Sequence, residues 1–155
     1  MLNMIAPLEV GFCVKDMDLM LDFYTRVLGL AFVSSFNVAG DDSAVAGFTP
    51  DGYQVVRLQT NYGERIKLVK PGSDPAPRVS GSHVLSCLGN TYLTLIVRDL
   101  KATLASLKAA GMFIRTKGEI MEVRDGVYLS IVNDPEGNHL EFVEYRDIKE
   151  YRLDI

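Results

Sequence analysis

The chain of 155 residues contains one pattern twice. The first copy begins at Glu9 as EVGFCVKDMDLMLDFYTRVLGL, and the second begins at Tyr92 as YLTLIVRDLKATLASLKAAGM. Each copy has a run of strand-forming residues, an Asp suited to cap a helix, an apolar helical pattern and a Gly suited to end that helix. Asp16 and Asp99 are therefore equivalent positions. Because two copies of one open unit can bury each other's sheets, the repeat predicts two half-repeats in one compact domain.

The remaining segments of each half follow the same order. After the first strand, at residues 8–15, and a helix with the apolar stripe Met17 to Leu28, three strands are expected in AFVSSFNV, YQVVRLQ and RIKLVK. The second half has YLTLIV, a helix at about 100–110, FIRTK with its extension EIMEV, VYLSIVN and HLEFVEY. The sequence therefore predicts an α+β fold of two tandem βαβββ modules that form a cupped mixed sheet.

The halves are separated by PGSDPAPRVSGSHVLSCLGN, whose proline, glycine and serine content is typical of a connecting loop. We expect a first module at residues 1–75, a linker at 76–89, and a second module with a short C-terminal tail at 90–155. The insertion DDSAVAGFTPDG at 41–52 has two interpretations: a lid over a pocket, or a surface loop or short helix without function.

Composition narrows the class of partner. A net charge of −4 and a pI near 5.1 provide no basic field for nucleic acid, so a small organic molecule is the expected partner. No apolar run approaches the roughly 18–20 residues that span a bilayer, and no secretory signal is recognisable, which predicts a cytoplasmic protein without membrane contact. Cys13 and Cys87 have no pairing pattern, which indicates reduced thiols.

A second similarity joins the ends of the halves. GERIKLVKP, which begins at Gly63, aligns with the segment that begins at Gly137 in DPEGNHLEFVEY. Lys67 therefore occupies the position of Glu141.

This paired βαβββ pattern, with VKDMDLMLDFYTRVLGL after the first strand and NDPEGNHLEFVE at the end, resembles the vicinal oxygen chelate superfamily of glyoxalase I, extradiol dioxygenases and bleomycin-binding proteins. The resemblance implies a cup between the sheets. In metal-dependent relatives a divalent cation such as Fe, Mn, Ni, Co or Zn is held there by His or Glu side chains of the first and last strands. The matching positions are Glu9, Lys67, Tyr92 and Glu141.

Only Glu9 and Glu141 are ordinary metal ligands, because Tyr92 ligates rarely and the Lys67 ammonium has no free lone pair and repels a cation. The ligand set is therefore incomplete, and the alternative is a site without metal. In that hypothesis Glu141 is a catalytic base, Lys67 stabilises an oxyanion or enolate, and Tyr92 donates a hydrogen bond. A competing interpretation makes Glu9 and Lys67 a buried ion pair that only fixes the strands.

Three further residues are candidates for substrate binding. Arg57 lies on a strand whose inner face would look into the cup, where a guanidinium can clamp an anionic ligand, although an outward salt bridge is the alternative. Cys13 ends the first strand. His139 shares a strand face with Glu141, where it either lines the cup as a replacement ligand or ends at the solvent-exposed rim.

Two functions follow from these residues. The leading hypothesis is an enzyme of the glyoxalase and dioxygenase type, a lyase, isomerase or oxygenase that forms an oxyanion or enolate of a small organic substrate. Ring cleavage by dioxygen has least support, because its iron centre in relatives needs two histidines and a carboxylate, and this chain has only His83 and His139. The alternative is a metal-free small-molecule-binding protein of the bleomycin-resistance type. We expect a homodimer, since the modules of relatives often pair across chains.

Overall fold

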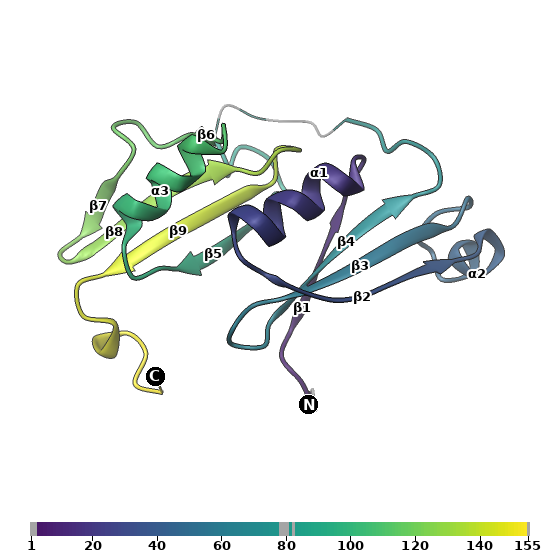
Figure 1. Ribbon diagram of the computed structural model, residues 1–155, viewed down its shortest axis with the longest axis horizontal. Helices are drawn as coiled ribbons and strands as arrows, with labels where there is room; N and C mark the ends of the chain where they lie inside the picture. The colour runs from purple at the N-terminus through teal and green to yellow at the C-terminus, as the bar shows by residue number, and fades with distance from the viewer. Residues whose placement is uncertain (1–2, 78–80, 82, 155) are drawn as a thin grey trace. The chain divides into compact units, whose positions relative to one another are not determined.

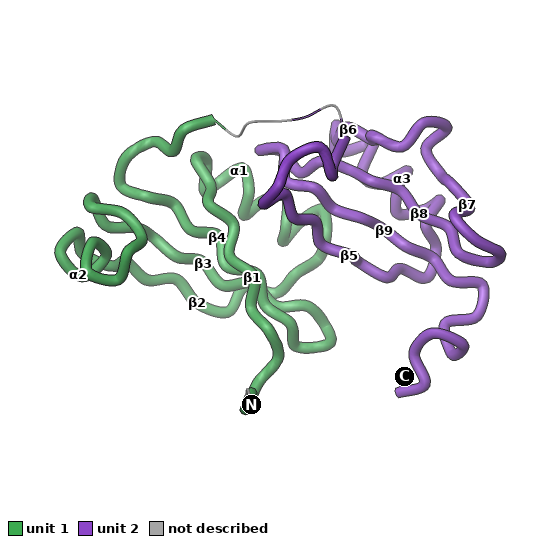
Figure 2. Tube along the Cα trace, turned by 180° about the vertical axis from the view of Figure 1, so that it is seen from behind, with its two compact units in different colours: residues 1–78 green, residues 79–155 purple. Residues whose placement is uncertain are grey.

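The computed structural model describes residues 3–77, 81 and 83–154, and the chain forms two compact units, residues 1–78 and 79–155 (Figure 2). Each unit contains one sheet of mixed parallel and antiparallel strands with few helices, which confirms the predicted α+β class. Part of the predicted linker, residues 78–80 and 82, lies outside the described residues. None of the helices in the described residues is long and apolar enough to cross a membrane.

The first unit is a four-stranded sheet with one face covered by a helix (Figure 1). Its spatial order is β1-β4-β3-β2, in which β1 runs parallel to β4 and the other pairs are antiparallel. The elements in chain order are β1 (Glu9–Cys13), α1 (Met17–Asp22), β2 (Ala31–Val38), α2 (Gly40–Val45), β3 (Tyr53–Gln59) and β4 (Arg65–Pro71). The predicted βαβββ order is therefore present, with α2 as an addition between β2 and β3.

The helix after β1 begins where the sequence predicts. The Asp16 carboxylate accepts a hydrogen bond of 3.0 Å from the Leu19 amide, which satisfies a donor of the first turn. The predicted single helix to Leu28 is modified, because α1 continues as a wider π-helical turn over Phe23–Val27. Gly29 follows at a φ of +78°, a left-handed conformation that ends the helix.

The core of the first unit lies between α1 with its π-helical turn and the sheet. Phe23 and Tyr24 are among the largest fully buried side chains, and their rings pack edge to face at 5.1 Å. On β4 the burial alternates, so Ile66 and Leu68 are buried while Arg65 and Lys67 are partly exposed. This period of two assigns Arg65 and Lys67 to the face opposite the helix.

The second unit repeats the design with one additional strand. Its sheet has the order β5-β9-β8-β6, with β5 parallel to β9 and β7 paired to β8. The elements are β5 (Tyr92–Ile96), α3 (Leu100–Ala109), β6 (Phe113–Ile114), β7 (Met121–Arg124), β8 (Val127–Asn133) and β9 (His139–Tyr145), followed by a 3₁₀ turn at Ile148–Glu150. The predicted strand FIRTK with EIMEV is in fact two short strands, because a turn with Gly118 and Glu119 at positive φ interrupts it.

Helix α3 packs on β8 and β9 and buries its apolar stripe there. Its N-terminus is capped by Asp99, whose carboxylate accepts a 2.8 Å hydrogen bond from the Ala102 amide. The apolar residues of this core are Leu100, Leu104, Leu107, Val132, Leu140 and Phe142. Ser130 is buried among them, and its hydroxyl has no hydrogen-bond partner in the described part of the chain.

The insertion between β2 and β3 forms the short helix α2 and a turn. Ser43 is fully buried, and its hydroxyl donates to the Thr49 carbonyl at 2.5 Å and accepts from the Thr49 amide at 3.2 Å. These bonds join α2 to the turn that follows it within the insertion. Its use as a lid stays a prediction.

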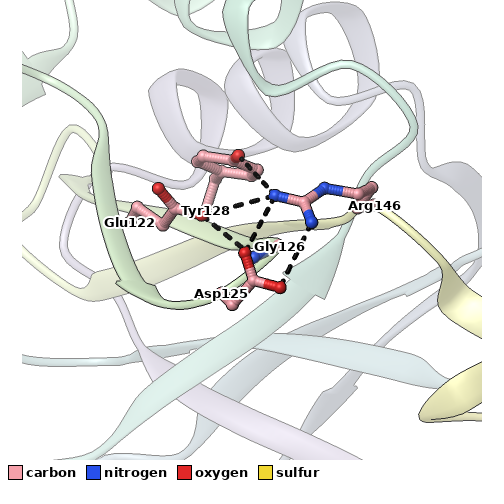
Figure 3. Close-up of polar contacts among 5 residues, drawn as sticks. All are labelled: Glu122, Asp125, Gly126, Tyr128 and Arg146. Atoms are coloured by element: carbon pink, nitrogen blue, oxygen red, sulfur yellow. Dashed lines mark hydrogen bonds and ion pairs between the residues drawn. The ribbon is translucent and has the colours of Figure 1, made fainter.

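An ionic and polar cluster closes the β7–β8 hairpin against the end of β9 (Figure 3). Arg146 lies 3.1 Å from Asp125 and 3.7 Å from Glu122, and it donates to the Tyr128 hydroxyl at 3.4 Å. The hydrogen bonds to Tyr128 and Asp125 raise the pKa of Arg146, so its guanidinium stays charged. Because the contacts join the hairpin to the residue that follows β9, we assign the cluster a structural role.

Candidate functional site

The sheet face of the first unit that lies opposite α1 carries most of the polar residues that the sequence selected there. Residues paired directly across strands share a face, and the register pairs Glu9 with Arg65, Gly11 with Lys67, and Lys67 with Arg57. Strand alternation adds Cys13, two residues beyond Gly11, to the same face. The sheet therefore brings Glu9, Arg57 and Lys67 together, as the repeat and the strand pattern indicate.

Glu9 lies among three cations. Its carboxylate oxygens are 3.4 Å from a guanidinium nitrogen of Arg65, 3.5 Å from Nε of Arg57 and 3.9 Å from the ammonium of Lys67. The side chain of Glu9 is 28% exposed and those of the cations 32–38%. We call these four residues the Glu9 cluster. It has an excess of two positive charges, on a chain whose net charge is −4.

Local packing explains how three long cations fit on one small surface. Gly11 has no side chain, and the Lys67 Cε lies 4.0 Å from the place where a Cβ of residue 11 would be, so Lys67 extends over β1. Arg57 is held from the other side by Phe36 of β2, with the guanidinium 4.8 Å from the ring centroid. Nε of Arg65 donates to Gln59 at 2.8 Å.

Arg57 has one nitrogen that makes no hydrogen bond within the described residues. Its Nε is buried and makes no hydrogen bond to the described residues, although it lies 3.5 Å from a Glu9 oxygen. The Glu9 carboxylate compensates the charge of Arg57 at that distance without a hydrogen bond of good geometry, and the rest of the guanidinium is partly exposed. Arg57 therefore makes an ion pair with Glu9, and its predicted role in binding an anionic ligand stays a prediction.

The second unit holds the other predicted residues. Glu141 on β9 accepts a 2.6 Å hydrogen bond from the Thr94 hydroxyl on β5. His139 is 6% exposed, and its Nδ1 lies 2.9 Å from the Asn133 side-chain oxygen. Tyr92 is the register partner of His139 and is 44% exposed. The predicted roles of these residues as base, donor and substrate-binding group stay predictions.

The residues of the Glu9 cluster do not fit a divalent metal. A cation bound to either Glu9 oxygen would lie close to three positive charges, each within 4 Å of that carboxylate. In the second unit the ordinary ligands are Glu141 and His139, and the described residues contain no group of three His, Cys, Asp or Glu side chains placed to hold an ion. We therefore derive no step of chemistry through a metal.

Arg65, Gln59 and Phe36 belong to the site but were not selected from the sequence. Arg65 was accessible to sequence reasoning, because it lies two residues before Lys67 on the same strand and must share its face. Phe36 was not accessible to sequence reasoning, because its position beside Arg57 depends on a register shift of β2 between Phe32 and Ser34.

Comparisons with known proteins agree with this architecture. The family model of the Glyoxalase/Bleomycin resistance protein/Dioxygenase superfamily matches residues 5–142. The chain belongs to this superfamily, which confirms the resemblance drawn from the paired βαβββ pattern. No curated protein matches the chain.

Several solved structures share the fold at low sequence identity. A glyoxalase family protein from Bacillus cereus is 18% identical with a TM-score of 0.75, over 94% of this chain and 97% of that one. A glyoxylase/bleomycin resistance protein/dioxygenase domain from Frankia is 15% identical with a TM-score of 0.70, over 97% and 100%. The trypanothione-dependent glyoxalase I of Leishmania major is 20% identical with a TM-score of 0.65, over 93% and 89%. At these identities the likeness concerns the fold alone.

Proposed function

We propose that this chain is a metal-independent enzyme of the superfamily that binds a small organic anion at the Glu9 cluster. Arg57 and Lys67 then stabilise negative charge that develops on a substrate oxygen. One observation supports the proposal above the others: three cationic side chains surround a single carboxylate on the sheet face opposite α1.

Electrostatics favours an anionic ligand at this place. Two unit charges 4 Å apart interact by about 4 kcal/mol at an effective dielectric of about 20, and Glu9 compensates three such charges incompletely. The planar guanidinium of Arg57 suits a carboxylate or an enediolate, since it donates two parallel hydrogen bonds. A substrate with an acidic group beside a carbonyl therefore matches the cluster better than a neutral or cationic one.

The reaction class follows from the charge that the cations can support. Fixed donors aimed at a developing oxyanion are among the largest contributions to catalysis, and Lys67 with Arg57 would supply the positive charge that a metal supplies in metal-dependent relatives. Removal of a proton beside a carbonyl produces such an oxyanion, so we favour an isomerase or lyase over an oxygenase. Glu141 as the base is part of the proposal and is tested separately below.

A binding protein without catalysis is the second candidate. The described residues of the first unit place no carboxylate at the cluster other than Glu9, which is engaged by three cations. Anion binding without turnover, as in the bleomycin-resistance alternative, is consistent with that arrangement. Both candidates require the same first step, which is capture of a small anion.

The experiment measures binding and proton exchange on the same samples. Calorimetric titration with pyruvate, malonate and phosphate is compared with acetamide as a neutral control, and proton NMR in deuterium oxide follows exchange of the carbon-bound protons of a panel of 2-oxo acids. We expect Arg57→Gln and Lys67→Gln each to weaken anion binding about tenfold, while Lys101→Gln on the exposed face of α3 does not. Exchange that is lost in Glu141→Gln would support Glu141 as the base.

The outcomes separate the candidates. Binding with catalysed exchange supports the enzyme, and binding without exchange of any 2-oxo acid supports the binding protein. If Arg57→Gln and Lys67→Gln bind the anions as the unchanged protein does, the Glu9 cluster is not the site and the proposal is wrong. A cytoplasmic location and a homodimer are further proposals, and light scattering of the purified protein tests the second.

A further inference from the structure

A pocket of about 640 Å³ lies within the second unit, and none of its lining residues belongs to the Glu9 cluster. It is lined by His83 and Val84, by Phe113 of β6, by residues 115–117 and by Ile131 of β8. Ligand pockets commonly have volumes of about 300–1,000 Å³, so a small organic molecule fits a space of this size.

The polar wall of the pocket is fixed by the neighbouring strand. The Arg115 amide donates to the Ile131 carbonyl at 2.8 Å, and the Ile131 amide donates to the Thr116 hydroxyl at 2.8 Å. The Glu119 amide then closes the turn on the Thr116 carbonyl at 2.9 Å. The backbone that carries Arg115 and Lys117 is thus anchored before any ligand arrives, which lowers the entropic cost of binding.

The lining combines apolar surface with positive charge. Phe113 is 66% exposed, and Ile131 and Val84 add aliphatic surface. Arg115 and Lys117 supply the charge, and none of the described residues that line the pocket is acidic. Lys117 makes no ion pair with the described residues, because Glu119 in the same turn pairs with Lys108.

The charges on this sheet face change in a fixed order from one strand to the next. Ile131 on β8 is paired in register with Glu141 on β9, so their side chains share a face, and the segment with Arg115 and Lys117 lies on the opposite side of β8. Across the sheet the order is therefore cation, aliphatic side chain, carboxylate. An acid whose body contacts Ile131 would be repelled by Glu141 at one end and attracted by Arg115 and Lys117 at the other.

We propose that this pocket binds a small organic acid with one carboxylate and a compact aromatic body. The carboxylate lies at Arg115 and Lys117, and the aromatic body covers Phe113 and Ile131. All the residues that line the pocket belong to the second unit, whereas the residues of the Glu9 cluster belong to the first.

The test uses 1-naphthoate as the probe and 1-naphthalenemethanol as its neutral counterpart. The protein carries ¹³C on the isoleucine δ1 methyl groups, and Ile131→Val assigns the Ile131 resonance. We expect 1-naphthoate to shift that resonance in a saturable way and to bind about tenfold more tightly than the alcohol, because only the acid forms charge-assisted hydrogen bonds.

Variants separate the two parts of the pocket. Lys117→Gln should weaken 1-naphthoate binding about fivefold to tenfold and leave the alcohol unchanged, whereas Phe113→Ala should weaken both. Lys149→Gln, at an exposed lysine of the same unit that does not line the pocket, should change neither. Phe113 and Lys117 are exposed, so neither change should unfold the chain, and circular dichroism verifies this.

Three results would overturn the assignment: no shift of the Ile131 methyl, equal affinity for acid and alcohol, or unchanged affinity in Lys117→Gln. Arg57→Gln keeps this test distinct from that of the proposed function. If Arg57→Gln abolishes 1-naphthoate binding and Lys117→Gln does not, the probe occupies the Glu9 cluster. In that case this proposal is wrong while the proposed function stands.

Discussion

Glu9→Gln is the change that most directly tests the charge arrangement of the first unit. It removes the only negative charge among the four members of the Glu9 cluster and keeps the side chain nearly isosteric. The three cations then face one another without a counter-charge. We expect two opposite effects: a less stable fold, and tighter binding of small anions, because Glu9 no longer competes with them.

The expected loss in the free energy of unfolding follows from the ion-pair distances and from the exposure of the four side chains. Three ion pairs of 3.4–3.9 Å would each contribute about 4 kcal/mol at an effective dielectric of about 20. The side chains are 28–38% exposed, and measured contributions of solvent-exposed pairs are about 0–1 kcal/mol. The loss in the free energy of unfolding should therefore be about 1–2 kcal/mol for the three pairs together. A similar gain for an incoming anion corresponds to about fivefold to thirtyfold tighter binding.

The assays are urea unfolding and calorimetric titration with malonate, both at about 0.1 M and about 1 M salt. The Debye length falls from about 10 Å to about 3 Å over this range, so both effects should shrink at high salt. Glu150→Gln, which removes one charge from the exposed C-terminal turn, is the matched control. Weaker or unchanged malonate binding in Glu9→Gln, or a stability loss equal to that of the control, would refute the reasoning.

Three further predictions concern the second unit. Ser130→Ala should raise the free energy of unfolding by about 1 kcal/mol in urea titration, because it removes a buried hydroxyl without a partner among the described residues. Asp99→Ala should lower it by about 1 kcal/mol through loss of the helix cap, with Asp99→Asn as the conservative control that keeps an acceptor. Burial, with a smaller effect of Tyr151, raises the pKa of Tyr145. The folded state then prefers the neutral phenol. The contribution of Tyr145 to the free energy of unfolding should therefore be fully present below about pH 10 and be lost as the pH rises through the folded pKa. Tyr145→Phe should remove that part of the pH dependence.

The fold was accessible to sequence reasoning because its signals are local and occur twice. Asp16 and Asp99 cap the helices they were expected to cap, with hydrogen bonds of 3.0 Å and 2.8 Å. Each expectation depended on a few adjacent residues and was supported by the other copy. The details that differ from the expectation, such as the π-helical turn at Phe23–Val27 and the turn that divides β6 from β7, depend on packing within the unit.

The site was less accessible, because it depends on registers between strands. Lys67 was selected from the repeat and the family resemblance, and Arg57 from the strand pattern. Their common approach to Glu9 nevertheless requires the parallel pairing of β1 with β4 and the antiparallel pairing of β3 with β4. The ring contact of Phe36 with Arg57 requires in addition a register shift in β2. No local pattern contains these long-range pairings, and a shift of one residue would move each side chain to the other face.

The comparison of the two last strands explains why this fold is easier to recognise than its chemistry. Ile66 and Leu68 of β4 correspond to Leu140 and Phe142 of β9, and all four are buried apolar residues. The alternating positions differ: Arg65 corresponds to His139, and Lys67 to Glu141. Packing against the helix restricts one face to apolar side chains, whereas the other face is free to change its charge without loss of the core. The first copy carries the cations Arg65 and Lys67 at these positions, and the second carries the carboxylate of Glu141. The function of this chain is therefore to be sought in the difference between its two copies, because their likeness lies in the buried core and the helix caps that both copies need to fold.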